Sequence, residues 1–183
     1  MARVEHVEPG TLAPELRRLF ELFAAEHFEN QARVLAHSPA VFRHIYGLVA
    51  DLRAEGELPR RLVEVAVVAT SADNRCKYCV GHHAPVLKAM GLAAATVDRI
   101  LDPDVPGLDE RERLVRDYAV LVTERPWGIR DRVFGELRAH FSERQIVELT
   151  ARIALCGLFN RLNDALQIEV EESLITQGDG PHQ

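Results

Sequence analysis

Four residues in the first half of the chain have the types and the spacing of a thiol active site. Glu64 is followed by eleven residues, then by Cys76 and Cys79 as a Cys-x-x-Cys pair, and after three more residues by His83. Residues three and four positions apart share one face of a helix, so Cys76, Cys79 and His83 would be stacked on successive turns. The pattern therefore predicts two thiols and an imidazole within reach of one another.

Thiol chemistry needs a stabilised thiolate, and this spacing offers two means of obtaining one. Cys76 would lie at the N-terminus of a helix, where unpaired backbone N–H groups and the helix dipole favour negative charge. His83, one turn after Cys79, is placed to exchange a proton with that sulfur. Glu64 would return toward the cysteines if the polar break at residues 73–75 reverses the chain. It could then orient His83, which would also satisfy a carboxylate in an apolar helix.

A zinc site is the main alternative for a Cys-x-x-Cys pair. His82 or His83 could supply a third ligand, but a closed structural site needs four. The third cysteine, Cys156, lies far along the sequence, and no second Cys-x-x-Cys occurs. We interpret Cys156 as an inert core residue, and His82, about 100° off the reactive face, as a surface or interface residue. We therefore expect no bound metal or other cofactor.

Helical periodicity dominates the segments that must position these residues. Apolar residues recur at three and four positions, with capping and stop signals at the ends of the runs. The predicted helices begin near Pro14, Pro39, Pro59, Cys76, Ala93, Asp109, Asp131 and Ser142. The helix after Pro59 is apolar on most sides, which is typical of a helix buried in the middle of a bundle. Runs that alternate with a period of two are absent, so we predict an all-α fold.

The chain is near the size of one ordinary domain. We predict a single all-helical domain over residues 1–176, with the redox motif in its first half, a linker near residues 102–108, and a disordered tail over residues 177–183. The segment around Glu148 resembles the segment around Glu64, and superposing the two places Cys76 over Asn160 and Cys79 over Asn163. This similarity indicates either an internal duplication or a chance likeness between two amphipathic helices. In neither case is Glu148 the catalytic glutamate.

Composition excludes several classes of partner. The formal net charge is −6 and basic residues form no stripe, which is unlike a nucleic-acid-binding protein. No window approaches the roughly 20 apolar residues of a membrane-spanning helix, and the N-terminus lacks the apolar run of a signal peptide. An odd count of three cysteines does not indicate a secreted disulfide framework. We therefore expect a cytoplasmic protein that binds neither nucleic acid nor membrane.

The motif of Glu64, Cys76, Cys79 and His83 resembles the carboxymuconolactone decarboxylase-like superfamily, in particular its alkyl hydroperoxidase D branch. The resemblance covers about residues 35–169, including a later stretch at 159–166. It implies an all-helical homo-oligomer, a trimer or hexamer, that reduces organic hydroperoxides. It also implies that Cys79 is the attacking thiol, Cys76 the resolving thiol, His83 the base and acid, and Glu64 part of the proton relay.

Two further expectations follow from this resemblance. An external dithiol, such as a lipoyl group or a thioredoxin-like protein, would reduce the disulfide after each turnover. Tyr78 stands where the best-studied members carry a histidine; a phenol is a poor proton shuttle at neutral pH, and it would border the space that the substrate enters.

The same residues leave two other activities open. One is a general thiol–disulfide oxidoreductase with no preference for peroxides. The other is a redox sensor whose disulfide changes its assembly. Lactone decarboxylation is less favoured, because the decarboxylase members generally lack the cysteine pair.

Overall fold

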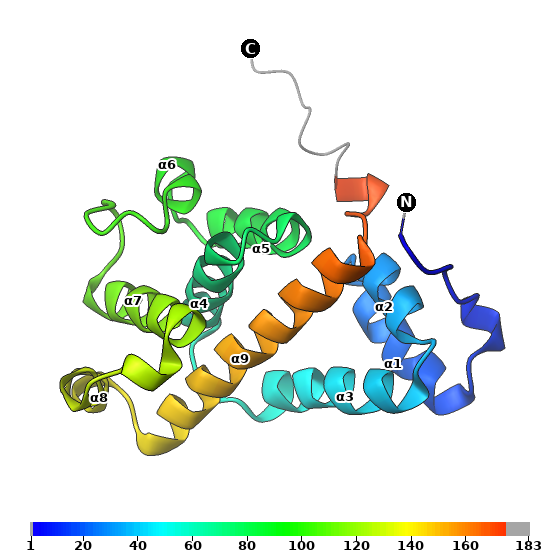
Figure 1. Cartoon of the computed structure of the whole chain (residues 1–183), viewed down its shortest axis with the longest axis horizontal. Helices are drawn as coiled ribbons and strands as arrows, with labels where there is room; N and C mark the ends of the chain where they lie inside the picture. Colours follow the sequence, from blue (N-terminus) through cyan, green and yellow to red (C-terminus); the bar gives the residue numbers. More distant parts are fainter. Residues whose placement is uncertain (1, 175–183) are drawn as a thin grey trace, which may run out of the picture. The chain divides into compact units, whose positions relative to one another are not determined.

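The computed structural model describes residues 2–174, and every regular element among them is helical (Figure 1). The helices in chain order are η1 (Pro9–Thr11), α1 (Pro14–Ala24), α2 (Glu29–Leu35), α3 (Pro39–Glu55), α4 (Arg60–Asp73), α5 (Lys77–Ala89), α6 (Ala94–Asp98), α7 (Glu110–Glu124), η2 (Pro126–Gly128), α8 (Asp131–His140) and α9 (Glu143–Leu166). The all-α prediction is confirmed. The expected tail at 177–183 lies outside the described residues.

One helix was not predicted. α2 begins after Phe28, which provides no side-chain hydrogen bond to the first turn, and the helix is only 7 residues long. It is too short to show a clear apolar repeat, and no capping residue marks its start. Its buried face, which includes Ala32 and Leu35, shows that tertiary packing stabilises it.

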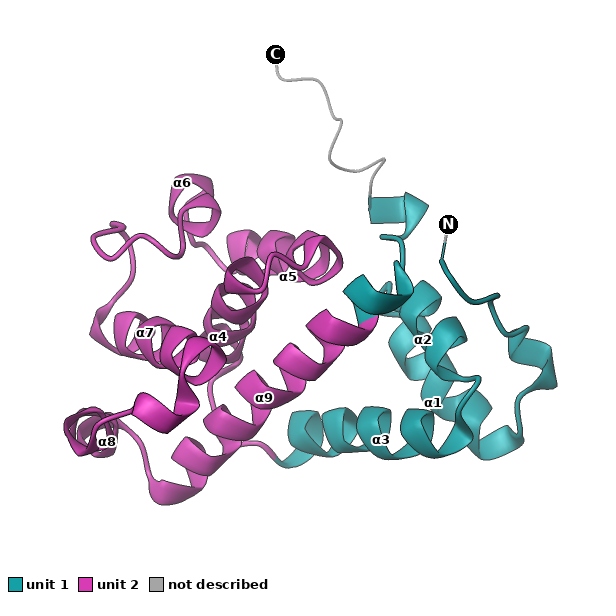
Figure 2. Ribbon diagram, viewed as in Figure 1, with its two compact units in different colours: residues 1–55, 163–183 teal, residues 56–162 magenta. Residues whose placement is uncertain are grey.

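The described residues fall into two compact units (Figure 2). Among the described residues, the first contains 2–55 and 163–174, and the second contains 56–162. In the first unit Tyr46 of α3 packs edge-on against Phe23, with ring centroids 4.1 Å apart. The Tyr46 hydroxyl donates to Gln31 at 2.7 Å, and Gln31 donates in turn to Asn163 at 2.7 Å. This buried polar chain connects α3, α2 and the end of α9.

The second unit is built around α4, as the nearly continuous apolar run after Pro59 predicted. α4 packs against α5 and α7, and Val65, Ala66 and Ala69 are completely buried. Since most residues of α4 are buried, a polar side chain at a buried position usually finds its partner inside the protein. Glu64 and Ser71 are two such side chains.

The segment at residues 102–108 lies inside the second unit, between α6 and α7. Arg116 of α7 is buried and donates to three carbonyl groups at its start, those of Ile100 at 2.8 Å, Asp102 at 2.7 Å and Pro103 at 3.1 Å. These bonds satisfy the backbone of an irregular segment and hold it against the helix.

No helix among residues 2–174 is both long enough and apolar enough to cross a bilayer.

A buried ion pair holds the start of α4 near the end of α5 and the start of α7. Glu112 forms a capping box with Asp109, through hydrogen bonds of 2.8 and 2.9 Å, and also accepts from the Arg61 side chain. Arg61 donates in addition to the carbonyl of Met90 at 2.8 Å. One carboxylate thus stabilises a helix end and orients a cation that bridges two other helices.

Replacing Glu112 by alanine should therefore lower the free energy of unfolding by about 2 kcal/mol, because the capping box is lost and Arg61 loses its buried partner. Glu110→Ala is the matched control, since Glu110 lies in the same first turn but its side chain is 79% exposed. It should change stability by no more than about 0.5 kcal/mol. Denaturant unfolding of both variants measures the difference, and equal effects would contradict the proposed importance of Glu112.

Candidate active site

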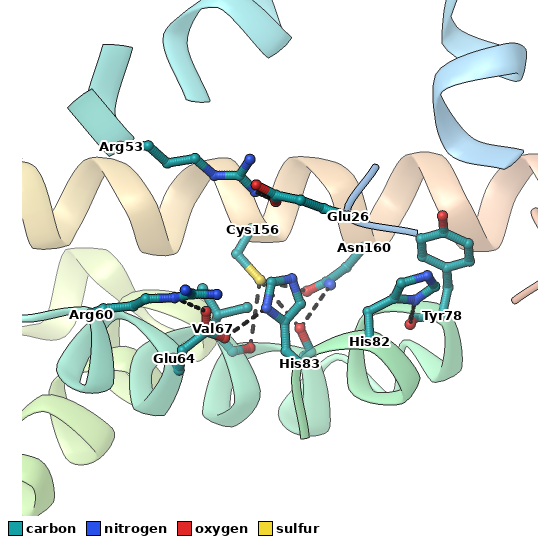
Figure 3. A network of polar contacts seen from close by, with 11 residues as sticks. Glu26, Arg53, Arg60, Glu64, Val67, Tyr78, His82, His83, Cys156 and Asn160 are labelled. Carbon is teal, nitrogen blue, oxygen red and sulfur yellow. Dashed lines mark hydrogen bonds and ion pairs between the residues drawn. The ribbon is translucent and has the colours of Figure 1, made fainter. Parts of the chain in front are cut away.

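The turn between α4 and α5 brings Glu64 and His83 into contact (Figure 3). His83 Nδ1 lies 2.8 Å from Glu64 Oε2, and Glu64 is buried. The sequence-based expectation that these two residues pair is therefore confirmed. A carboxylate accepts, so Nδ1 carries the proton in this contact, and proton exchange with other groups is left to Nε2. Arg60 lies 3.8 Å from the other oxygen of Glu64, which is a long contact, and its side chain is mostly exposed. This ion pair therefore stabilises the Glu64 carboxylate little.

Both cysteines of the pair lie at the N-terminus of α5. Cys76 is the N-cap residue, as predicted, and its carbonyl accepts the first helical hydrogen bond, from Val80 at 3.0 Å. Cys79 follows one turn later and is hydrogen-bonded to Cys76. Cys76 is fully buried and Cys79 is 5% exposed, and both are free thiols. The two sulfurs are therefore close, reduced and largely shielded from water.

The ionisation of Cys79 differs from the sequence-based expectation of a readily formed thiolate. The hydrogen bond to Cys76 and burial raise the pKa of the Cys79 thiol above its ordinary value. The thiol donates to its neighbour, and charge on one sulfur disfavours charge on the other. The motif predicts that the cysteines lie at a helix N-terminus, but it does not predict that Cys79 is buried. Cys79 consequently needs a base before it can react, which is the role available to His83.

The third cysteine lies near this pair in the fold, although it is far from it along the sequence. Cys156 of α9 is close enough for its charge to affect the pKa of Cys79. Its sulfur lies 3.3 Å from Ser71 Oγ and 3.6 Å from the carbonyl oxygen of Val67. Its burial confirms that it belongs to the core, and burial raises its pKa to about 12. Cys156 is thus a protonated thiol next to the reactive pair.

Three polar residues outside the motif complete the surroundings of the thiols. Asn160, one turn after Cys156, donates to Ser71 Oγ at 3.2 Å and accepts from the Asn74 side chain at 2.9 Å. None of the three was predicted from the sequence as a site residue. One signal for them exists: Glu64, Val67 and Ser71 share a face of α4 at spacings of three and four. Cys156 and Asn160 share a face of α9 in the same way.

Tyr78 and His82 form a second aromatic pair on α5. Their rings stack with centroids 4.2 Å apart, and His82 Nδ1 donates to the Tyr78 carbonyl at 2.7 Å. Both residues are buried, so the assignment of His82 to the surface was wrong. The His82 ring packs against Tyr78, one turn earlier on the same helix. The angular position of His82 on a helical wheel does not predict this contact. Whether Tyr78 borders the path of a substrate stays a prediction.

Glu148, the counterpart of Glu64 in the internal similarity, has a different environment. It accepts from the backbone N–H of Glu57 and from the Arg152 side chain, both at 2.8 Å. It therefore holds the chain ahead of α4 against α9. Within residues 2–174 no group of three or more histidine, cysteine or acidic side chains is placed to hold a metal ion.

The protonated state of Cys156 has a direct chemical consequence. Because burial holds its pKa near 12, it should resist alkylation by iodoacetamide in the native protein between pH 7 and 9, which are test conditions below that pKa. After mild oxidation and unfolding, mass spectrometry should find Cys156 as the free thiol and Cys76 joined to Cys79. A mixed population of disulfides that includes Cys156 would contradict this assignment.

Comparison with known proteins agrees with this architecture. Residues 39–120 match the model of the carboxymuconolactone decarboxylase family. A peroxidase-related protein from Ralstonia eutropha JMP134, with an alkylhydroperoxidase AhpD core, is 26% identical, with a TM-score of 0.83 over 98% of this chain and 97% of that one. A protein of unknown function from Agrobacterium tumefaciens, linked by its description to AhpD and antioxidant defence, is 26% identical. Its TM-score is 0.67 over 74% of this chain and 93% of that one.

A more distant structure shares the fold alone. A cysteine-to-alanine variant of the debrominase Bmp8, in complex with 2,3,4-tribromopyrrole, is 21% identical, with a TM-score of 0.77 over 96% of this chain and 95% of that one. None of the functionally curated proteins matches the chain at a significant level. The match of residues 39–120 to the family model and the fold shared over nearly the whole length support a relationship to the carboxymuconolactone decarboxylase-like superfamily, with the fold of its alkyl hydroperoxidase D-like members.

Proposed function

We propose that the protein is a thiol-dependent peroxidase that reduces organic hydroperoxides through a cycle between the Cys76–Cys79 dithiol and its disulfide. The observation that carries the proposal is the contact between Glu64 of α4 and His83 of α5. The hydrogen-bonded thiols of Cys76 and Cys79 lie at the start of that same helix α5. A carboxylate that accepts from one nitrogen of an imidazole fixes its tautomer and orientation, and leaves the other nitrogen to accept a proton. Cys79 is a buried thiol with a raised pKa, so it needs a base such as His83 to remove its proton before it can attack.

The first half of the cycle oxidises one thiol. His83 takes the proton of Cys79, and the thiolate attacks the terminal oxygen of the hydroperoxide. The S–O bond forms as the O–O bond breaks, so Cys79 becomes a sulfenic acid and the substrate leaves as an alkoxide. His83 returns its proton to that alkoxide, which becomes an alcohol. The sulfur has lost two electrons and the peroxide has gained them.

The second half of the cycle closes and reopens the disulfide. The sulfur of Cys76 attacks the sulfenic sulfur of Cys79, water leaves, and a Cys76–Cys79 disulfide forms. The hydrogen bond between the two thiols means that this step needs little rearrangement. An external dithiol then returns two electrons, and a lipoyl group or a thioredoxin-like protein is the reductant we propose. As the resemblance implies, we also propose that the protein assembles as a trimer or hexamer.

The relatives support the chemical class. The similar structure from Ralstonia eutropha is described as peroxidase-related, and the one from Agrobacterium tumefaciens as linked to antioxidant defence. A general thiol–disulfide oxidoreductase would use the same two sulfurs, but it would not need the Glu64–His83 pair to protonate an alkoxide. The comparison of peroxide with disulfide substrates therefore separates the two activities.

The purified protein should consume an organic hydroperoxide in the presence of a dithiol, and it should do so faster than it reduces a small-molecule disulfide. Cys79→Ser should abolish peroxide consumption, because no thiolate remains beside His83. Cys76→Ser should consume one equivalent of peroxide and then stop, because the sulfenic acid at Cys79 has no resolving thiol.

Two measurements check these outcomes. Peroxide loss gives the turnover, and a dimedone-type probe followed by mass spectrometry locates the sulfenic acid. Labelling of Cys76 in the Cys79→Ser variant, with none at Cys79 in the Cys76→Ser variant, would reverse the proposed roles. Disulfide turnover that exceeds peroxide turnover would favour the general oxidoreductase.

Glu64→Gln should lower kcat/KM for the hydroperoxide about 100-fold, since general acid–base catalysis contributes on that order and the amide cannot stabilise a protonated His83. Glu148→Gln is the matched control, because Glu148 is as buried as Glu64 but binds Glu57 and Arg152 instead. It should leave kcat/KM unchanged in folded protein. Equal losses in the two variants would mean that Glu64 acts only through stability.

A further inference from the structure

The side-chain amide of Asn160 occupies a position next to Cys79 that neither the motif nor the family match explains. Asn160 is 1% exposed and lies on α9, while Cys79 lies at the start of α5. The amide is hydrogen-bonded to the Cys79 sulfur. A buried polar side chain that contacts a reactive sulfur is either a structural partner or part of the chemistry. The direction of its hydrogen bonds distinguishes the two.

The neighbours of Asn160 orient its amide. Its oxygen accepts from Asn74 at 2.9 Å and lies 3.8 Å from the Cys156 thiol, which also donates toward it. Its nitrogen donates to Ser71 Oγ at 3.2 Å. An amide nitrogen has two hydrogens, so the second is available for the Cys79 sulfur. A flipped amide would direct its oxygen at that sulfur and its nitrogen at two donors, so the network favours the orientation observed.

The two neighbouring thiols do not favour negative charge on the Cys79 sulfur. Cys76 and Cys156 both oppose ionisation of Cys79, and burial opposes it too. Asn160 acts in the opposite direction, since its hydrogen bond favours the charged form. In a site with little water, a donor fixed before the reaction is worth more than one that must reorient.

We infer that Asn160 is a catalytic residue, which donates a hydrogen bond to the Cys79 sulfur and stabilises the thiolate as His83 removes the proton. This inference rests on the thiol chemistry proposed above and assigns that site a donor outside the motif. Ser71 and Asn74 are positioning residues, since they act on the sulfur only through the orientation of the amide. The active site then draws on α4, α5 and α9 rather than on α4 and α5 alone.

The ionisation of Cys79 tests the inference without any peroxide. In a Cys76→Ser background the thiol of Cys76 no longer bonds to Cys79, and peptide mass spectrometry follows the alkylation of Cys79 separately from that of Cys156. In that background Asn160→Asp keeps the shape of the side chain and its bond from Asn74, but directs an oxygen at the sulfur. Alkylation of Cys79 by iodoacetamide at pH 7, a chosen test condition, should slow by about tenfold or more, because a hydrogen bond to a charged group is lost. The pH midpoint of alkylation should rise accordingly.

Asn163→Asp is the matched control, since Asn163 is equally buried on α9 but its side chain binds Gln31. It should leave the alkylation rate of Cys79 unchanged. Asn160→Leu serves as a second test variant of similar volume, in case the aspartate disturbs folding, and circular dichroism confirms which variants fold. An unchanged pH midpoint in a folded Asn160 variant overturns the inference.

The two proposals fail in different ways. If the Asn160 variants shift the ionisation of Cys79 but the parent protein consumes no hydroperoxide, the inference stands and the peroxidase proposal fails. If the parent consumes hydroperoxide and the Asn160 variants leave both ionisation and turnover unchanged, the inference alone fails.

Discussion

The reversal of the chain at Arg75 determines where the thiols, Glu64 and His83 lie. Arg75 adopts a left-handed backbone conformation, with φ at 58°, which is uncommon for a residue that has a side chain. The N–H of Cys76 then bonds back to the carbonyl of Ser71 at 2.9 Å, closing the end of α4 in the manner of a Schellman motif. The same residue, Cys76, is the N-cap of α5. Because one helix ends and the next begins within three residues, α5 must return along α4, and Glu64 meets His83.

Burial governs the reactivity of the site. A thiol at a helix N-terminus is normally easier to ionise, yet burial and the hydrogen bond to Cys76 raise the pKa of Cys79. A protein that keeps such a thiol protonated protects it from chance oxidation. Reaction then depends on groups that can accept the proton and bear the charge, and the groups we propose for this are His83 with Glu64, and Asn160.

The sequence predicted the parts of the site that lie close together along the chain. The break at residues 73–75, the N-cap position of Cys76 and the pairing of Glu64 with His83 all follow from local spacing, and the structure confirms them. The contribution of α9 did not follow, because periodicity shows which face of a helix is apolar but not which distant helix covers it. The same limit explains why the proximity of Cys156 to the pair and the burial of His82 were not predicted.

The partners of the thiols are separated widely in the sequence. Asn160 and Ser71 are 89 residues apart along the chain, and Cys156 and Ser71 are 85 apart. During synthesis the cysteine pair therefore emerges long before α9, and contacts of such high sequence separation form late because of the entropy of closing a long loop. Until α9 packs, Cys79 lacks its contacts with Cys156 and Asn160. The surroundings of the Cys79 sulfur are thus complete only after the distant end of the unit has folded against α4 and α5.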